Sequence, residues 1–160
     1  MRDPVRLIAL LLATLCWPTA PAAALNPDQL LDRAGPAVVT VRAFAGGASV
    51  GAGSGVVLPS GRIGAGCRQV DTAGAWRIGQ DGHSTAAVLV AADRDGRLCL
   101  FAPADPIGTP SRPRLGRLRP NATVYVVGRP RGLEATATPG RVIHAGDGRT
   151  NPIQTTAAVS

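Results

Sequence analysis

The sequence predicts an all-β protein, a sandwich or barrel built from short strands. Beyond residue 35, short apolar and β-branched runs alternate with Gly, Pro, Asp and Ser. No segment in this part repeats its apolar residues with the helical period of about 3.6. Turn signals separate the runs, as PSG, QDG, DRDG and GDGR. Short strands at such spacing are typical of all-β sandwiches and barrels.

Residues 1–24 have the organisation of a secretory signal peptide. Two arginines, Arg2 and Arg6, precede an apolar run over 7–17, and three alanines stand at 22–24, before the expected cleavage site. A membrane anchor is the alternative, but the apolar run is shorter than a bilayer requires. We therefore expect a periplasmic or secreted protein without a membrane span after cleavage.

The remaining elements follow in order along the chain. Residues 25–35 contain a short helix, PDQLLDRA at 27–34, with Asn26 as its N-cap and Pro27 at the first helical position. Gly35 and Pro36 end this helix. The predicted strands are 37–43, 53–59, 75–79, 86–93, 97–101, 123–128, 135–145 and 152–156. The basic, Pro-rich stretch 105–120 is interpreted as a connection between two β units.

The charge of the chain comes from arginine alone. All 17 basic residues are Arg, and the formal net charge of +7 becomes +6 once Arg2, Arg6 and Asp3 are removed. Six lie close together: Arg112, Arg114, Arg117, Arg119, Arg129 and Arg131. Weak polyanion binding by this strip is one hypothesis. An aromatic content of 3% opposes single-strand binding by base stacking, so a solvated basic face is favoured.

Two cysteines follow the signal peptide, Cys67 and Cys99. An isolated pair in an oxidising compartment usually forms a disulfide, and we expect one here. Two free thiols are the alternative. A zinc site is disfavoured because no histidine is close to either cysteine in the sequence. We expect neither a metal nor a cofactor.

Four stretches carry a resemblance to a known family. GAGSGVVLPSGRI, LVAADRDGRLCLF, VYVVGRPRGLEATATPGRVI and IQTTAAVS occur in this order over about Gly35 to Ser160. Together they resemble the bacterial trypsin-like serine proteases of the HtrA-like group. The resemblance implies a chymotrypsin/trypsin-like double β-barrel. Its first barrel would be complete over 36–110, and its second would be partial over 111–160.

The resemblance also implies where the catalytic residues should lie. Some members read T-N-C-H-V, and matching that cysteine to Cys67 places Arg68 at the histidine position. The aspartate directly precedes the L-C-L triplet in similar sequences, which places Arg97 at that position. The serine motif P-G-x-S-G-G, expected after IQTTAAV, does not occur. The resemblance thus implies a degenerate and C-terminally truncated member with no catalytic residues.

Chemistry indicates what these replacements mean. The mechanism needs an imidazole base and a carboxylate that orients it, and a guanidinium cannot act as a base near neutral pH. His83 and His144 are rejected as substitutes because neither has a positioned partner in the sequence pattern. Ser54 is rejected because it lacks the G-x-S-x-G spacing of a nucleophile elbow and falls on a predicted hairpin strand.

We interpret the chain as a catalytically inactive pseudoprotease or remnant. A protein partner would bind at its incomplete second barrel. One alternative is a serine endopeptidase completed by a missing C-terminal segment. Another is a small basic module that binds polyanions.

Overall fold

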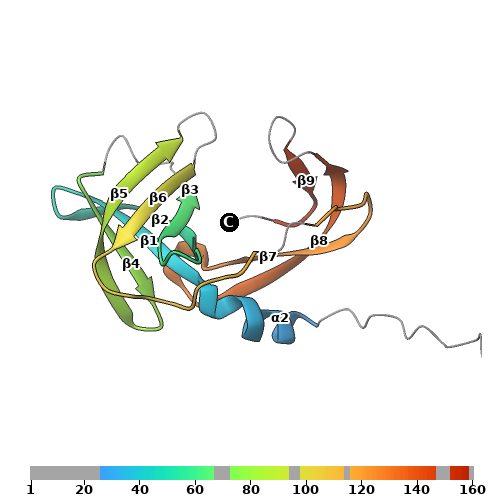
Figure 1. The fold of residues 1–160 in the computed structure, drawn as a ribbon, viewed down its shortest axis with the longest axis horizontal. Coiled ribbons are helices and arrows are strands. Elements are labelled where there is room, and N and C mark those ends of the chain that lie inside the picture. Colours follow the sequence, from blue (N-terminus) through green and yellow to red (C-terminus); the bar gives the residue numbers. More distant parts are fainter. Residues whose placement is uncertain (1–25, 67–72, 94–97, 114–115, 147–151, 159–160) are drawn as a thin grey trace, which may run out of the picture.

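The fold consists of a closed β-barrel and a smaller open sheet, joined by a long connector and flanked by one helix (Figure 1). The structure, a computed structural model, describes residues 26–66, 73–93, 98–113, 116–146 and 152–158. The predicted signal peptide lies outside these residues, and so do Cys67, Arg68, Arg97 and Arg114. The all-β prediction, with a complete first barrel and a partial second one, is confirmed.

The barrel has six antiparallel strands in the order β1-β2-β3-β6-β5-β4, and it closes where β4 pairs with β1. Closure leaves this part of the chain without a free sheet edge. The strands are β1 (Val38–Ala45), β2 (Ala48–Val57), β3 (Ile63–Gly66), β4 (Ala75–Gln80), β5 (His83–Asp93) and β6 (Leu98–Pro103).

The barrel interior is filled by side chains that alternate along the strands. Trp76 and Phe101 form its aromatic centre, with ring centroids 4.7 Å apart. Around them lie Val39, Val41, Ala43, Val57, Ile63, Ala65, Ile78 and Cys99. Gly55 also faces inward, because a Cβ there would lie 2.7 Å from Ile63 Cγ2. Alternate residues of each strand therefore face the core, which is the alternation that predicts strands from sequence.

The predicted strands match the observed ones closely, with two exceptions. Strand β3 was not predicted, since its sequence, IGAG, has only one β-branched residue and two glycines. It pairs with β2 and β6, and Ile63 is fully buried. Strand β2 begins five residues earlier than predicted, because ASVGA pairs with the end of β1 across a bulge at Ala43/Phe44. In both cases tertiary pairing outweighs a weak local preference.

The helix α2 (Pro27–Ala34) is confirmed as predicted, with Asn26 as its N-cap. The Asn26 side chain accepts a hydrogen bond from the Gln29 backbone at 2.8 Å, and the Gln29 side chain accepts one from the Asn26 backbone at 3.3 Å. This reciprocal capping box satisfies two amides at the helix start. A short 3₁₀ turn, η1 (Gly35–Ala37), then leads directly into β1.

The second lobe is a three-stranded antiparallel sheet in the order β7-β8-β9. It contains β7 (Thr123–Gly128), β8 (Thr136–Ala145) and β9 (Ile153–Thr155), and a 3₁₀ turn, η2 (Pro130–Gly132), separates the first two. Only Val142 of these strands is fully buried, whereas Ile143 and Ile153 are exposed. A protein partner at this sheet stays a prediction.

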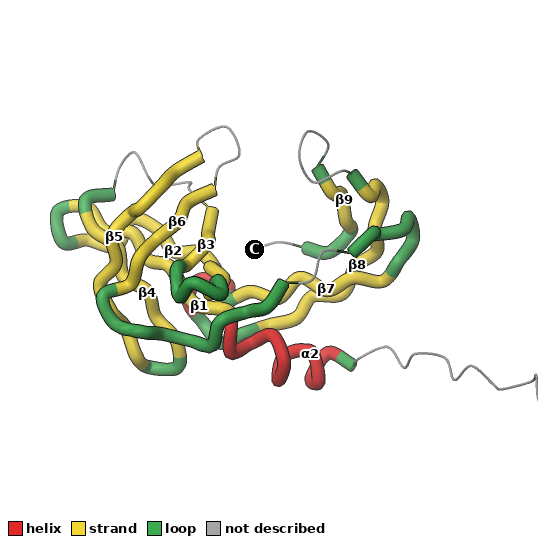
Figure 2. The backbone as a smooth tube through the Cα atoms, in the orientation of Figure 1, coloured by secondary structure: helices red, strands yellow, loops and turns green. Residues whose placement is uncertain are grey.

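The connector between the lobes runs along the barrel before it reaches the second sheet (Figure 2). It is fixed by backbone hydrogen bonds from Thr109 to Pro36 at 2.7 Å and from Ser111 to Val57 at 2.8 Å. Gly108 directly precedes Thr109 and has a φ of +69°. The connector is therefore part of the packed structure of the barrel.

Among the described residues, no helix is long and apolar enough to cross a membrane. The predicted export stays a prediction.

We predict that Gly108→Ala destabilises the protein by about 2–4 kcal/mol, because left-handed strain and overpacking add. The new methyl group would lie 2.9 Å from Val57 Cγ2 and 3.0 Å from the Pro36 carbonyl oxygen. Urea unfolding followed by fluorescence measures the change.

Gly61→Ala is the matched control, since Gly61 has a similar φ of +76° but nothing within 4 Å of the added atom. It should cost about 1–2 kcal/mol, the left-handed strain alone. Equal losses for the two variants would refute the close packing of the connector.

Candidate functional site

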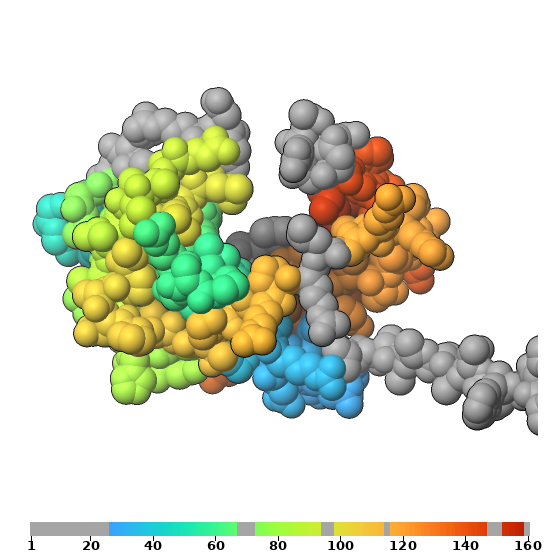
Figure 3. All heavy atoms as spheres, in the orientation of Figure 1, coloured from blue at the N-terminus to red at the C-terminus, as the bar shows by residue number. Residues whose placement is uncertain are grey.

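An open cleft separates the two lobes at one end of the molecule (Figure 3). Its cavity measures about 590 Å³ and is lined from both sides. Ala52, Gly53, Ser54, Ala65 and Gly66 line it from the barrel. Val126, Val127, Gly128, Thr136, Thr138 and Ala158 line it from the second lobe. Val41, Ala43 and Trp76 also line it from the barrel. Most of the lining residues are Ala, Gly, Ser or Thr, and a surface of this kind suits an extended peptide.

The strand ends that flank the two predicted catalytic positions lie together at this cleft. Strand β3 ends at Gly66, two residues before Arg68, and β6 begins at Leu98, directly after Arg97. Gly66 and Leu98 are paired across the sheet. Arg68 and Arg97 themselves lie outside the described residues. The register therefore brings the chain just before Arg68 and the chain just after Arg97 to one edge of the barrel.

A second hollow lies beside the cleft, with a volume of about 430 Å³. It shares Ala65 and Gly66 with the cleft. Gly64 of β3 and residues of β5 and β6, including Asp93 and Leu98, line the rest. Asp93 pairs with Leu98 at the end of β5. A carboxylate thus lies near the predicted aspartate position, but in the neighbouring strand.

Ser54 lines the cleft, yet its hydroxyl has a structural partner. Its Oγ accepts a hydrogen bond of 2.8 Å from the backbone amide of Arg129. The two histidines do not line the cleft. His83 is exposed in the β4–β5 hairpin and His144 is exposed in β8, and neither imidazole makes a hydrogen bond or ion pair with a described residue. The described residues therefore hold no serine–histidine pair at the cleft.

Arg129 joins the second lobe to the barrel. It follows β7, is only 8% exposed, and donates from Nε to the Val38 carbonyl oxygen at 2.8 Å. Its Nη2 forms an ion pair with Asp81 Oδ1 at 2.8 Å. Asp81 belongs to the β4–β5 hairpin turn, where it and Gly82 have positive φ values of 49° and 84°. One guanidinium thus connects β1, this hairpin and the turn after β7.

The sequence predicted that Arg129 belongs to a solvent-exposed strip of six arginines, but the structure buries this side chain. Arg112, Arg117, Arg119 and Arg131 are exposed, and Arg114 lies outside the described residues. Sequence reasoning missed the burial of Arg129 because the G-R-P-R-G stretch gives no signal that separates its two arginines. Polyanion binding by the exposed members stays a prediction.

No group of three or more His, Cys, Asp or Glu side chains that could hold a metal ion occurs among the described residues. The expectation of no metal and no cofactor stays a prediction.

Comparisons with known proteins show which solved structures share this fold. No family model matches the chain, and no curated protein matches it in sequence. Among solved structures it is similar to the serine endoprotease from Yersinia pestis, with a TM-score of 0.72 and 27% identity over 86% of this chain. It is also similar to an inactive mutant form of Rv3671c from M. tuberculosis H37Rv, with a TM-score of 0.67 and 20% identity over 86% of this chain.

The fold is that of a trypsin-like serine protease. The chain spans 51% of the length of the Yersinia protein and 77% of the length of the Rv3671c structure. In this fold the cleft between the lobes is the candidate functional site, since β3, β6 and the segment after β9 all lead to it.

We predict that Arg129→Gln lowers the free energy of unfolding by about 1.5–3 kcal/mol, the range for a hydrogen bond made by a charged group. The loss stems mainly from the bond to Val38, because the Asp81 side chain is 72% exposed and its ion pair is screened by solvent. Amides of β7 and β8 should exchange with deuterium faster than in the parent protein.

Arg131→Gln provides the control, since Arg131 lies two residues away but is exposed. Its stability should stay within about 0.5 kcal/mol of the parent protein, as for most surface substitutions. If Arg129→Gln behaves in the same way, Arg129 does not join the lobes.

Proposed function

We propose that this protein is a pseudoprotease, a trypsin-like serine-protease fold that does not hydrolyse peptide bonds and acts as an interaction module. One observation carries the proposal: arginine occupies both positions at which the resemblance places the base and its orienting carboxylate, Arg68 and Arg97. Both structural neighbours are serine proteases by fold, so the comparison supports the ancestry. The loss of activity is inferred from chemistry.

The two replacements remove the proton-transfer machinery. The histidine of a catalytic triad takes the proton of the serine hydroxyl and later returns it to the leaving amine. A guanidinium has a pKa far above neutral pH and stays protonated throughout this cycle. The aspartate normally stabilises the imidazolium, and a second cation in its place would oppose it. Both steps of acyl transfer therefore lose their acid–base partner.

The described part of the cleft supports a binding role. Strands from both lobes line a cavity of about 590 Å³, mostly with Ala, Gly, Ser and Thr residues, so an extended peptide has access to strand backbone. Ser54, whose hydroxyl faces this region, accepts a hydrogen bond from Arg129 and holds the lobes at their junction. The proposed module would thus keep a peptide-binding surface without the chemistry.

A serine endopeptidase completed by a further C-terminal segment is the alternative function. Such a segment would supply the serine and the amides that stabilise the oxyanion. It would not supply a base at position 68 or a carboxylate at position 97. We therefore favour the inactive form whether or not further chain follows residue 160.

We predict that the protein is not labelled by an active-site fluorophosphonate, because no general base is available to activate a serine hydroxyl. Ser54→Ala should give the same blank result, which separates background from a reaction at that hydroxyl. Intact-protein mass spectrometry reads the added mass. Stoichiometric labelling of the parent protein would overturn the proposal.

The proposal includes a disulfide between Cys67 and Cys99. Cys99 is 4% exposed in the barrel core. Its cross-strand partner is Ala65, which precedes Cys67 by two residues. Positions two residues apart from a direct pair are diagonal neighbours across a sheet, and long side chains can still meet there. The bond would also fit the predicted export to an oxidising compartment.

We predict that Cys67→Ser lowers stability by about 3–4 kcal/mol, the loop-entropy value for a ring of about 33 residues. Peptide mapping without reductant should recover a Cys67–Cys99 peptide pair in the parent protein. Recovery of both cysteines as free thiols, after purification under oxidising conditions, would contradict the pairing.

A further inference from the structure

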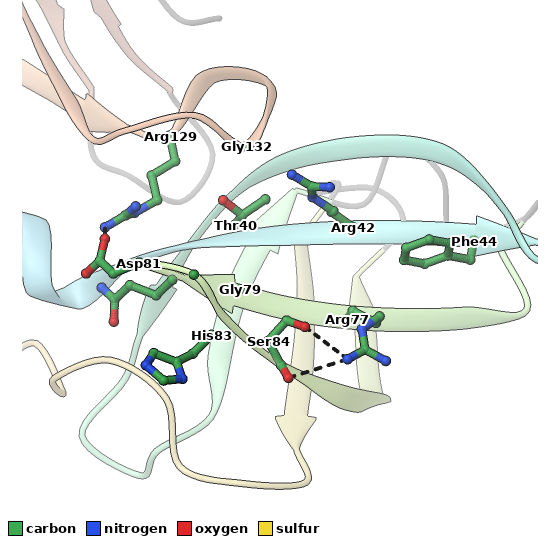
Figure 4. Close-up of a pocket in the computed structure, with 12 residues that line it drawn as sticks. Thr40, Arg42, Phe44, Arg77, Gly79, Asp81, His83, Ser84, Arg129 and Gly132 are labelled. Atoms are coloured by element: carbon green, nitrogen blue, oxygen red, sulfur yellow. Dashed lines mark hydrogen bonds and ion pairs between the residues drawn. The ribbon is translucent and has the colours of Figure 1, made fainter.

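Another pocket lies on the outer face of the barrel, apart from the cleft between the lobes and from the hollow beside it. We call it the arginine pocket, after three of its lining residues, Arg42, Arg77 and Arg129 (Figure 4). It has a volume of about 360 Å³ and shares no lining residue with the cleft. Its lining also includes Thr40, Phe44 and Ser84. This volume lies within the usual range of small-ligand sites.

Strand register creates an unusual charge arrangement in this pocket. Arg42 of β1 and Arg77 of β4 are directly paired across the sheet. Their neighbours Val41, Ala43, Trp76 and Ile78 are buried in the barrel, so both arginines point to its outer face. Like charges directly opposite each other on neighbouring strands destabilise a sheet. The fold thus places a local electrostatic conflict at the pocket.

The two guanidinium groups turn away from each other (Figure 4). Arg77 donates from Nη2 to Ser84 Oγ at 2.9 Å. Arg42 reaches toward the turn after β7, where its Nη2 would lie 2.7 Å from a Cβ added to Gly132. Within the described part of the chain, the Arg42 guanidinium has no hydrogen bond and no ion pair. Its five N–H donors are therefore available to a ligand.

The pocket also carries a net positive charge. Its ionisable lining comprises three arginines, one aspartate and His83, which leaves a formal charge of +2 with the imidazole neutral. The aspartate, Asp81, is engaged by Arg129 at 2.8 Å and so does not neutralise the other two arginines. Arg42 and Arg77 together lack a counter-ion among the described residues that line the pocket.

We propose that the arginine pocket binds a phosphate-type oxyanion, held between Arg42 and Arg77. Guanidinium groups bind phosphate and carboxylate oxygens through parallel N–H bonds. A carboxylate uses both its oxygens on one such fork. A tetrahedral dianion offers oxygens to two guanidiniums at once. Its binding would turn the guanidiniums of the paired Arg42 and Arg77, which point apart in Figure 4, toward each other. The hydroxyls of Thr40 and Ser84 are further donors on the same wall.

The inference does not depend on the proposed loss of protease activity, because the arginine pocket and the cleft have no residue in common. The ligand is either free inorganic phosphate or a phosphate monoester on a small molecule. The empty volume beside Phe44 would accommodate the organic part of an ester.

Calorimetric titration of the purified protein with inorganic phosphate, glycerol 3-phosphate and acetate at constant ionic strength tests the proposal. We expect saturable binding of phosphate, of the ester, or of both, and at least tenfold weaker binding of acetate. Tighter binding of the ester would identify an esterified ligand, and equal or weaker binding would identify the free ion. No heat above the chloride blank, or equal affinity for acetate, would overturn the proposal.

Substitutions separate the pocket from general charge effects. Arg42→Gln and Arg77→Gln should each weaken phosphate binding about tenfold or more, as expected for loss of a charge-assisted hydrogen bond. Arg117→Gln is the matched control, since it removes one exposed arginine from the connector strip and should change the affinity less than twofold. Equal effects of all three would indicate nonspecific attraction and overturn the site.

The melting temperature of the same variants, with and without phosphate, is a second test. Two arginines with only a structural role would not show the reversal expected here. Without phosphate, Arg42→Gln should melt at a higher temperature than the parent protein, because the like-charge pair is relieved. With saturating phosphate the order should reverse, since only the parent protein gains from binding. A parent protein that is more stable than Arg42→Gln under both conditions would contradict the proposed conflict.

Discussion

The buried guanidinium of Arg129 is the constraint that positions the two lobes. A buried charge is costly unless it is paired and hydrogen-bonded, so the Val38 carbonyl, Asp81 and the turn after β7 must meet at one point. The Ser54 hydroxyl adds a bond to the Arg129 backbone, and Gly128 allows the close approach, since a Cβ there would lie 3.0 Å from Ser54 Oγ. This junction adjoins the cleft between the lobes, since Ser54 and Gly128 also line it.

The barrel core shows which residues stabilise the scaffold. Its stability rests on inward-facing side chains such as Trp76, Ile78 and Phe101, and on closure between β4 and β1. The predicted catalytic positions, 68 and 97, follow β3 and precede β6 in the sequence and lie outside the described residues. A fold does not by itself imply an activity, so the proposed loss of proton transfer is compatible with an intact barrel.

The arginine pocket contains a cross-strand pair that is expected to destabilise the barrel, because two like charges lie opposite each other. Most cross-strand pairs in the barrel combine apolar or small residues, whereas Arg42 faces Arg77. Conflicts of this kind tend to mark functional positions in proteins whose other parts are locally consistent. The pocket is formed by β1, β4 and the turn after β7, so the junction at Arg129 that adjoins the cleft also forms one wall of this pocket.

The sequence by itself determined the features that depend on near neighbours in the chain. The capped helix at 27–34, the Asp81-Gly82 turn and β7 at 123–128 follow from capping, positive-φ and β-branched preferences. The family resemblance added the double-barrel architecture and the positions of Arg68 and Arg97.

Tertiary structure alone decided the rest. Strand β3 forms because β2 and β6 pair with it on both sides, although IGAG has little preference for a strand. Arg129 and Arg131 are indistinguishable in sequence, yet only Arg129 meets a carbonyl and a carboxylate contributed by residues 91 and 48 positions away. The pairing of Arg42 with Arg77 likewise depends on register, which long-range closure sets and no local pattern encodes.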